Sequence, residues 1–102
     1  MVKHIVMWRL HDEANGKSKA ENAKEFKSRL ESLIPKIDAI NSMEVGIGYA
    51  EAEGPVFDMV LTTSHDSKEK LTEYAVHPDH KEVVAFAKDI VAERRVVDYE
   101  VN

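Results

Sequence analysis

The alternation of apolar and polar positions near the start of the chain predicts a β-strand over residues 2–10. Successive side chains of a strand point to opposite faces, so the even positions share one face and the odd positions share the other. The even face consists of His4, Val6, Trp8 and Leu10, and the odd face consists of Lys3, Ile5, Met7 and Arg9. Apolar side chains are therefore expected on both sides of this strand.

Apolar residues recur at three- and four-residue steps after Ser18, and this spacing predicts an amphipathic helix. The stripe consists of Ala23, Phe26, Leu30, Leu33 and Ile37. Ser18 followed by Glu21 is the pattern of a capping box, so the helix is expected to begin there. Pro35 cannot continue a helix, so we expect its regular part to end near Leu33. The polar segment before the helix has Asn15-Gly16 at its centre, which is typical of a turn.

Alternating patterns predict two further strands, over residues 43–50 and residues 56–63. A turn is expected between them at residues 51–55, so the two strands should form an antiparallel hairpin. One face of the first of these strands is unusually small, because it consists of Glu44, Gly46, Gly48 and Ala50. We expect something bulky to approach that face.

The last third of the chain predicts two helical segments and a strand. Residues 64–67 introduce a short helical stretch, and Pro78 then suits the first position of a second helix, with His77 just outside it. One stripe of this second helix consists of Val83, Phe86, Ala87, Ile90 and Arg94. Alternation over residues 96–101 predicts the final strand.

The predicted order β-α-β-β-α-β is the split βαβ arrangement, an α+β ferredoxin-like fold with a four-stranded antiparallel sheet and helices on one face. No repeat or linker interrupts it, so residues 1–102 are expected to form one domain. The helices can cover only one face of the sheet, whereas the strands are apolar on both. We therefore expect a homodimer in which two sheets face each other as a dimeric α/β barrel.

Composition narrows the expected partners and location. The 19 acidic residues outnumber the 14 basic ones, which are dispersed, so nucleic acid is not an expected partner. The chain has no cysteine, which removes disulfides and thiolate chemistry and fits a reducing compartment. The charged N-terminal segment resembles neither a signal peptide nor a membrane span, so we expect a cytoplasmic protein without a membrane partner. The segments His11-Asp12-Glu13 and His65-Asp66 are interpreted as solvated turns, so no metal and no cofactor are predicted.

Residues 73–80 bring together the side chains best suited to acid–base chemistry. A neutral histidine in the first turn of a helix can accept an acidic α-proton, and a phenol can donate a hydrogen bond to the resulting enolate. His80 and Tyr74 fit these roles, and Asp98 is expected to fix the tautomer of His80. The helix terminus would lower the pKa of His80 and Asp98 would raise it, so the sequence leaves the direction open. The alternatives are a structural hydrogen-bond cluster and ligand binding without chemistry.

The order of the elements, the opening Val-Lys-His-Ile-Val, the Glu-Tyr-x-x-His-Pro-x-His stretch and the closing Val-Asp-Tyr together resemble the stress-responsive A/B barrel (Dabb) domain family, over essentially the whole chain. The resemblance implies a ferredoxin-like protomer that dimerises through its sheets. One plant member is a polyketide cyclase that uses a histidine and a tyrosine for an intramolecular aldol condensation. By this resemblance His80 and Tyr74 are the catalytic pair, and His4, Asp98 and Tyr99 lie beside the pocket.

Two residues of the first strand are candidates for contact with a ligand. His4 lies among apolar side chains, where a histidine is usually a core residue, and only the resemblance makes it a candidate. Trp8 would line a pocket for an apolar ligand or belong to the packed core. A further pocket histidine of the cyclase, on the third strand, has no expected counterpart, because Met59 or Phe57 occupies that region. Three functions stay open: binding of a small, mostly apolar or polyketide-like ligand between sheet and helices, a cyclase-type lyase activity, and a structural or stress-protective dimer.

Overall fold

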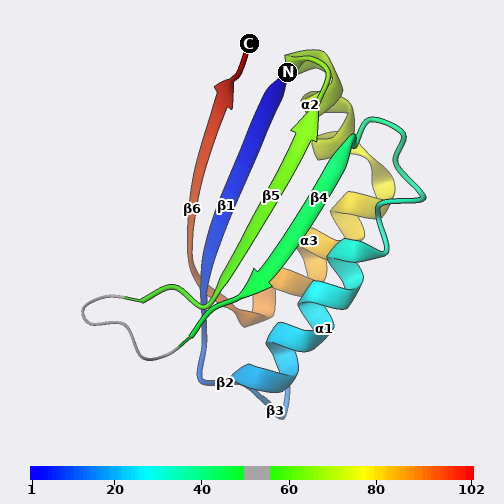
Figure 1. The fold of residues 1–102 in the computed structure, drawn as a ribbon. Coiled ribbons are helices and arrows are strands. Elements are labelled where there is room, and N and C mark those ends of the chain that lie inside the picture. The colour runs from blue at the N-terminus through cyan, green and yellow to red at the C-terminus, as the bar shows by residue number, and fades with distance from the viewer. Residues whose placement is uncertain (50–55) are drawn as a thin grey trace.

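All the helices lie on one face of a four-stranded antiparallel sheet in the computed structural model, which describes residues 1–49 and 56–102 (Figure 1). The elements are β1 Val2–Leu10, β2 Glu13–Ala14, β3 Lys17–Ser18, α1 Lys19–Glu31, β4 Ser42–Ile47, β5 Met59–His65, α2 Lys68–Val76, α3 Pro78–Ile90 and β6 Val91–Glu100. The strands of the main sheet follow the order β4-β5-β1-β6, and β2 and β3 form a separate small hairpin. This is the predicted α+β ferredoxin-like fold.

The first strand, β1, lies in the middle of the sheet, between β5 and β6. Its even-numbered side chains face the helices and are buried: Val2, His4, Val6, Trp8 and Leu10. The odd-numbered side chains point to the opposite face, where Met7 is 40% exposed. The alternation predicted for this strand is confirmed.

The core fills the space between the helix-facing side of the sheet and the helices. Phe26 of α1 packs against Trp8 with ring centroids 4.6 Å apart, and against Phe86 of α3 at 6.2 Å. All five residues of the predicted α1 stripe are buried: Ala23, Phe26, Leu30, Leu33 and Ile37. Truncating a buried phenylalanine to alanine costs about 3–5 kcal/mol, so loss of Phe26 would directly open the packing between α1 and the sheet.

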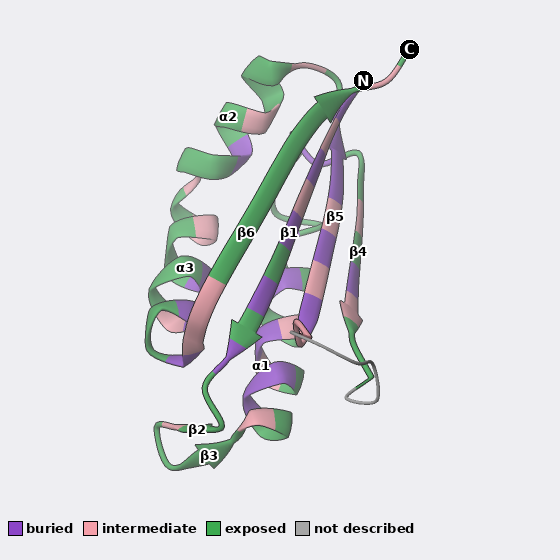
Figure 2. Cartoon of the chain, turned by 90° about the vertical axis from the view of Figure 1, so that its left-hand side faces the viewer, coloured by how far each residue is buried: buried purple, intermediate pink, exposed green. Residues whose placement is uncertain are grey.

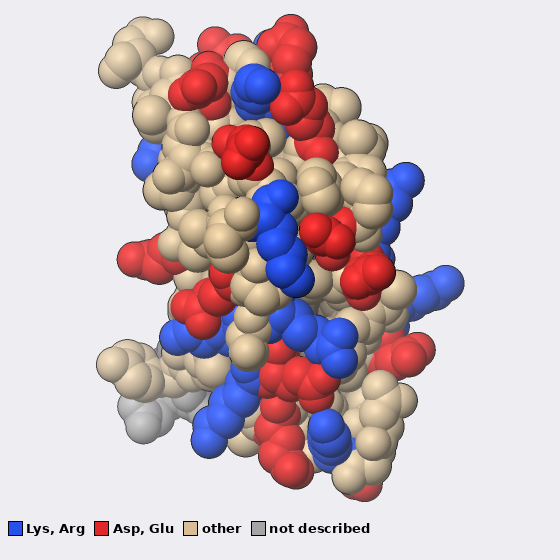
Figure 3. Space-filling model, turned by 90° about the vertical axis from the view of Figure 1, so that its right-hand side faces the viewer, with Lys and Arg blue, Asp and Glu red and all other residues tan. Residues whose placement is uncertain are grey.

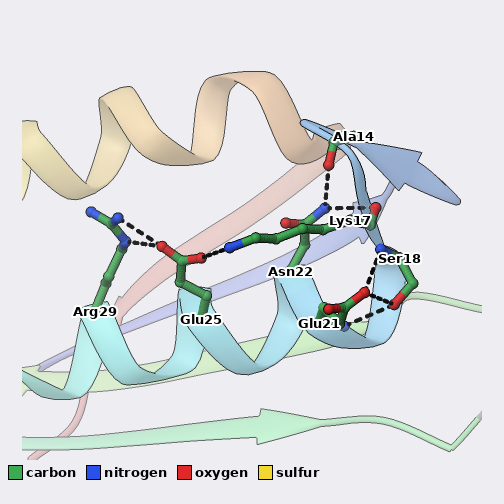
Figure 4. A network of polar contacts seen from close by, with 7 residues as sticks. All are labelled: Ala14, Lys17, Ser18, Glu21, Asn22, Glu25 and Arg29. Atoms are coloured by element: carbon green, nitrogen blue, oxygen red, sulfur yellow. Dashed lines mark hydrogen bonds and ion pairs between the residues drawn. The ribbon is translucent and has the colours of Figure 1, made fainter.

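The beginning of α1 is fixed by the predicted capping box (Figure 4). The backbone N–H of Glu21 donates to Oγ of Ser18 at 3.2 Å, and the N–H of Ser18 donates to Oε1 of Glu21 at 3.1 Å. Asn22, in the same turn, is buried, and its Nδ2 donates to the carbonyl of Ala14 at 3.1 Å. These bonds join the β2–β3 hairpin to α1, so the helix holds the polar segment before it in place.

Several predicted element boundaries differ from the structure. The helical stripe does not reach Arg94, because α3 ends at Ile90 and β6 begins at Val91, where the chain turns to pair with β1. The third strand is shifted to Met59–His65 and the regular helix α1 ends at Glu31. The turn predicted at residues 51–55, and Ala50 at the end of the strand before it, lie outside the described residues.

The face of the sheet opposite the helices is uncovered in the single chain (Figure 1). Met7 pairs with Val60 of β5, and Ile5 pairs with Val97 of β6, so apolar side chains from three strands meet on this face. Gly46 of β4 lies opposite Val60, and a Cβ at Gly46 would lie 3.2 Å from Cγ1 of Val60. The bulky neighbour expected beside the glycines of this strand is therefore, at Gly46, the valine on the next strand.

Charged side chains of both signs are interspersed over the helical side of the molecule (Figure 3). Within the part of the chain that the structure describes, no helix is long and apolar enough to cross a membrane.

Candidate functional site

A cavity of about 460 Å³ lies between the helices α1 and α3 and the sheet. Most of its wall is apolar and is formed by side chains that include Val6, Trp8, Phe26, Leu30, Leu61, Val83, Val84, Ala87 and Val91. Its polar wall residues are His4, Tyr74, His80, Lys81, Lys88 and Arg94. This volume and this mixture of many apolar and few polar groups are typical of a site for a small molecule.

Tyr74 lies at the centre of the polar part of the site. Its side chain comes from α2, is 1% exposed, and has its ring centroid 4.4 Å from that of His80, 5.3 Å from that of His65 and 6.2 Å from that of His4. Burial raises the pKa of Tyr74 to about 12, so the phenol keeps its proton at neutral pH. Its hydroxyl has no hydrogen-bond partner among the described residues.

His80 is positioned by the start of α3. Pro78 occupies the first turn and His77 caps the helix, accepting a bond from the N–H of Asp79 at 3.1 Å, as the sequence predicts for these two positions. Nδ1 of His80 donates to the carbonyl of Ala75 at 3.0 Å, which leaves Nε2 as the unprotonated nitrogen of the neutral ring. Burial lowers the pKa of His80, the hydrogen bond to Ala75 opposes this shift in part, and the nearby His4, Arg94 and His77 add to it. A neutral base beside a protonated phenol is therefore the resting state of this pair.

Asp98 does not contact His80 in the expected way. The pairing of β1 with β6 places Asp98 opposite His4, and Nδ1 of His4 donates to Oδ1 of Asp98 at 2.5 Å. The carbonyl of Ala75, rather than Asp98, fixes the tautomer of His80. The expected carboxylate–histidine pair exists, but its histidine is the one on the strand.

His65 is a buried histidine that the sequence interpretation missed. The sequence predicts a solvated turn at this position, but His65 ends β5, is 0% exposed and packs against Tyr74. Its Nδ1 donates to the carbonyl of Ala39 at 2.7 Å and its Nε2 accepts from Oγ1 of Thr63 at 2.9 Å. Burial lowers its pKa, so it is held neutral. The alternation of inward-facing positions that begins at Met59 includes position 65. This pattern in the sequence could have predicted that His65 is buried.

The residues predicted to contact a ligand do not all lie at the cavity. Trp8 lies in the cavity wall, as does His4. Tyr99 does not, because it follows Asp98 in the strand and pairs with Lys3 on the uncovered face of the sheet, where it is 43% exposed. The placement of Tyr99 beside the pocket is therefore wrong.

Comparison with known proteins agrees with this architecture. The model of the stress-responsive A/B barrel domain, Dabb, matches residues 2–101. The chain belongs to this family. The comparison with curated proteins found no match.

Solved structures show the same fold. A dimeric ferredoxin-like protein of unknown function from Bacteroides fragilis is 31% identical over 98% of this chain and 95% of that chain, with a TM-score of 0.86. A Dabb family protein from Mesorhizobium loti is 20% identical over 99% of this chain and 96% of that chain, with a TM-score of 0.72. A hydroxynitrile lyase from Passiflora edulis is 18% identical over 99% of this chain and 93% of that chain, also with a TM-score of 0.72. The last two matches establish similarity of fold alone.

Proposed function

We propose that this Dabb protein is a homodimer in which each protomer binds a small, mostly apolar ligand in the cavity between α3 and the sheet. The observation that supports this proposal best is the cavity itself, with its volume of about 460 Å³ and its largely apolar wall. A packed core leaves few voids larger than a water molecule, so a space of this size marks a place for another molecule. His4, Tyr74 and His80 supply the few polar groups that would orient it.

Binding is tested with decanol, a neutral probe, by titration calorimetry. Ala87 is buried on the cavity wall, and Ala87→Phe would fill part of the space, so the variant should bind decanol at least tenfold more weakly than the wild type. Ala20→Phe makes the same change at an exposed position of α1 and should leave binding unchanged. Because Ala87→Phe overpacks a buried position, a second variant is Val84→Phe, at an exposed part of the wall, which should fold as the wild type does and also bind decanol more weakly. Absence of binding of both decanol and its charged counterpart decanoate to the wild type would contradict the proposal.

The dimer is supported by the uncovered sheet face and by the relatives described as dimeric. A second copy would bury the apolar side chains that three strands present there, among them Val97, which is 53% exposed in the single chain. Light scattering should give twice the chain mass of 11.6 kDa. Val97→Lys would place a charge in this interface and should yield monomers. Val76→Lys, at a position 56% exposed on α2, is the matched control and should remain dimeric. A monomeric wild type would overturn this part.

A cyclase-type lyase activity is the second candidate, and the Tyr74–His80 pair favours it. Nε2 of His80 would take the α-proton of a poly-β-keto substrate, and the electron pair left on carbon would attack a second carbonyl of the same molecule. The alkoxide formed there would take the proton back from His80, and the Tyr74 phenol would donate a hydrogen bond to an oxygen that gains charge. The neutral state of His80 and the protonated state of Tyr74 suit these roles. The hydroxyl of Tyr74 has no partner among the described residues, so the protein leaves its hydrogen-bonding capacity unused.

This chemistry is tested with a triketide thioester whose cyclisation is followed by mass spectrometry. His80→Ala should reduce the rate to that of the uncatalysed reaction, while His11→Ala, at an exposed histidine, should leave the rate unchanged. Equal rates for His80→Ala and the wild type would remove the base role, without affecting the binding proposal.

A further inference from the structure

The cavity opens to solvent between α3 and β6. Its exposed wall residues come from these two elements: Lys81, Val84, Ala85 and Lys88 from α3, and Arg94 from β6. The wall residues from α1, β1 and β5 are buried. Figure 2 shows β6 at the edge of the sheet, exposed along most of its length, with α2 and α3 beside it.

Three of the side chains at this opening are cationic. Lys81, Val84 and Lys88 follow the spacing i, i+3, i+7, which places them along one side of α3. Arg94 is opposite Trp8 in the β1–β6 pairing, so its side chain lies on the helix-facing side of the sheet. The opening therefore combines positive charge from both of its edges with an apolar valine.

These cations lack acidic partners on the protein. No ion pair joins Lys81, Lys88 or Arg94 to an acidic side chain among the described residues, whereas Lys17, Arg29 and Arg9 elsewhere each have one. The carboxylate of Asp98, on the same side of β6 as Arg94, is already bound to His4. The chain has a net charge of −5, so acidic residues are in excess overall, yet they do not neutralise this opening.

We propose that the ligand of this cavity is an amphiphilic anion, whose apolar body fills the cavity and whose carboxylate is held at the opening by Arg94 together with Lys81 and Lys88. This inference rests on the proposed binding function and adds the charge of the ligand to it. A guanidinium binds a carboxylate through two parallel hydrogen bonds, and lysines add positive charge from the other edge. Because these groups are exposed, the ion pair forms without the full desolvation cost of a buried pair.

The volume limits the size of the apolar body. A water molecule takes about 30 Å³ of liquid, so about 460 Å³ corresponds to on the order of fifteen non-hydrogen atoms. Decanoate fits within this limit, and decanol has the same chain without the charge. The two probes therefore separate the contribution of the anion from that of the apolar body.

The experiment measures the affinities of decanoate, decyl phosphate, decanol and decylamine by titration calorimetry, below their aggregation concentrations. Wild-type protein should bind decanoate about tenfold or more tightly than decanol, decylamine should bind most weakly, and added salt should reduce the difference. Arg94→Gln and the double variant Lys81→Gln, Lys88→Gln should each lose most of the preference for decanoate while binding decanol as before. Lys36→Gln, at an exposed lysine outside the cavity wall, should keep the preference.

The outcomes distinguish the two proposals. Equal affinity for decanoate and decanol, or a preference that survives in Arg94→Gln and the double lysine variant, would overturn the anion inference and leave the binding proposal standing. If neither decanoate nor decanol binds, the binding proposal is overturned. Much tighter binding of decyl phosphate than of decanoate would support an anionic ligand but replace the carboxylate by a phosphate.

Discussion

Replacing Tyr74 by phenylalanine should make the protein more stable. The hydroxyl of Tyr74 is buried and has no hydrogen-bond partner among the described residues, whereas the ring packs between His80 and His65. Tyr74→Phe removes the hydroxyl and keeps the ring. If the hydroxyl serves a ligand rather than the fold, its removal should relieve the cost of burying it.

The size of the effect follows from two opposing contributions. A buried hydroxyl without a partner costs about 1–3 kcal/mol, and its deletion leaves a void smaller than a methyl group, which costs about 1 kcal/mol or less. The free energy of unfolding should therefore rise by about 1 kcal/mol. For a domain of this size that increase raises Tm by about 4–8 °C.

Urea and thermal unfolding, followed by the fluorescence of the single tryptophan Trp8, measure this change. Protein concentrations must be equal, because the stability of the proposed dimer would depend on concentration. Tyr49→Phe makes the same change at a side chain that is 84% exposed and should alter the free energy of unfolding by less than about 0.5 kcal/mol. A Tyr74→Phe protein that is less stable than the wild type would refute the reasoning, because the hydroxyl would then have a structural partner.

Three further predictions concern the scaffold of the site. Burial lowers the pKa of His65 in the folded state, so below about pH 6.5 the unfolded chain binds a proton that the folded chain does not. Thermal unfolding in a pH series should show that the free energy of unfolding decreases as the pH is lowered from about 6.5 to the folded-state pKa, by at most about 1.4 kcal/mol per pH unit for this histidine. A smaller decrease in His65→Asn would confirm that His65 causes it, and an unchanged decrease would exclude His65 as the cause. Ser18→Ala should cost about 1 kcal/mol in urea unfolding, because the bond from the N–H of Glu21 to Oγ of Ser18 is lost, and no change would exclude a stabilising cap. Gly16→Ala should lower the free energy of unfolding by about 1–2 kcal/mol, because the φ of Gly16 is +74°, although no atom lies within 4 Å of the new Cβ. An unchanged free energy of unfolding would exclude backbone strain at this turn.

Most of the fold was readable from the sequence because the long strands and helices have strong local patterns. The period of two in residues 2–10 gave both faces of β1, and the capping box gave the start of α1. The end of α3 was not readable in this way. Arg94 continues the helical stripe in the sequence, but its pairing with Trp8 places it in β6. Only tertiary structure decides whether this residue is in a helix or in a strand.

The site was only partly predictable, because it depends on which face of a strand each residue points to and on elements that meet only in the folded protein. Asp98 and Tyr99 are consecutive in a strand, so only one of them can face the helices, and the resemblance to the family named both. The partner of Asp98 depends on the register of β6 against β1, which no local pattern fixes. The three cations at the opening come from two elements that meet only after folding, so nothing in the sequence groups Arg94 with Lys81 and Lys88.

The central claim, that the cavity between α3 and the sheet holds a small apolar ligand, is tested most directly by intermolecular nuclear Overhauser effects between the protein and bound decanol. The account predicts contacts from the alkyl chain to the indole of Trp8 and to the methyl groups of Val84 and Leu61, all in the cavity wall. Contacts confined to Val97 and Met7 on the uncovered face of the sheet, with none to Trp8, would contradict it.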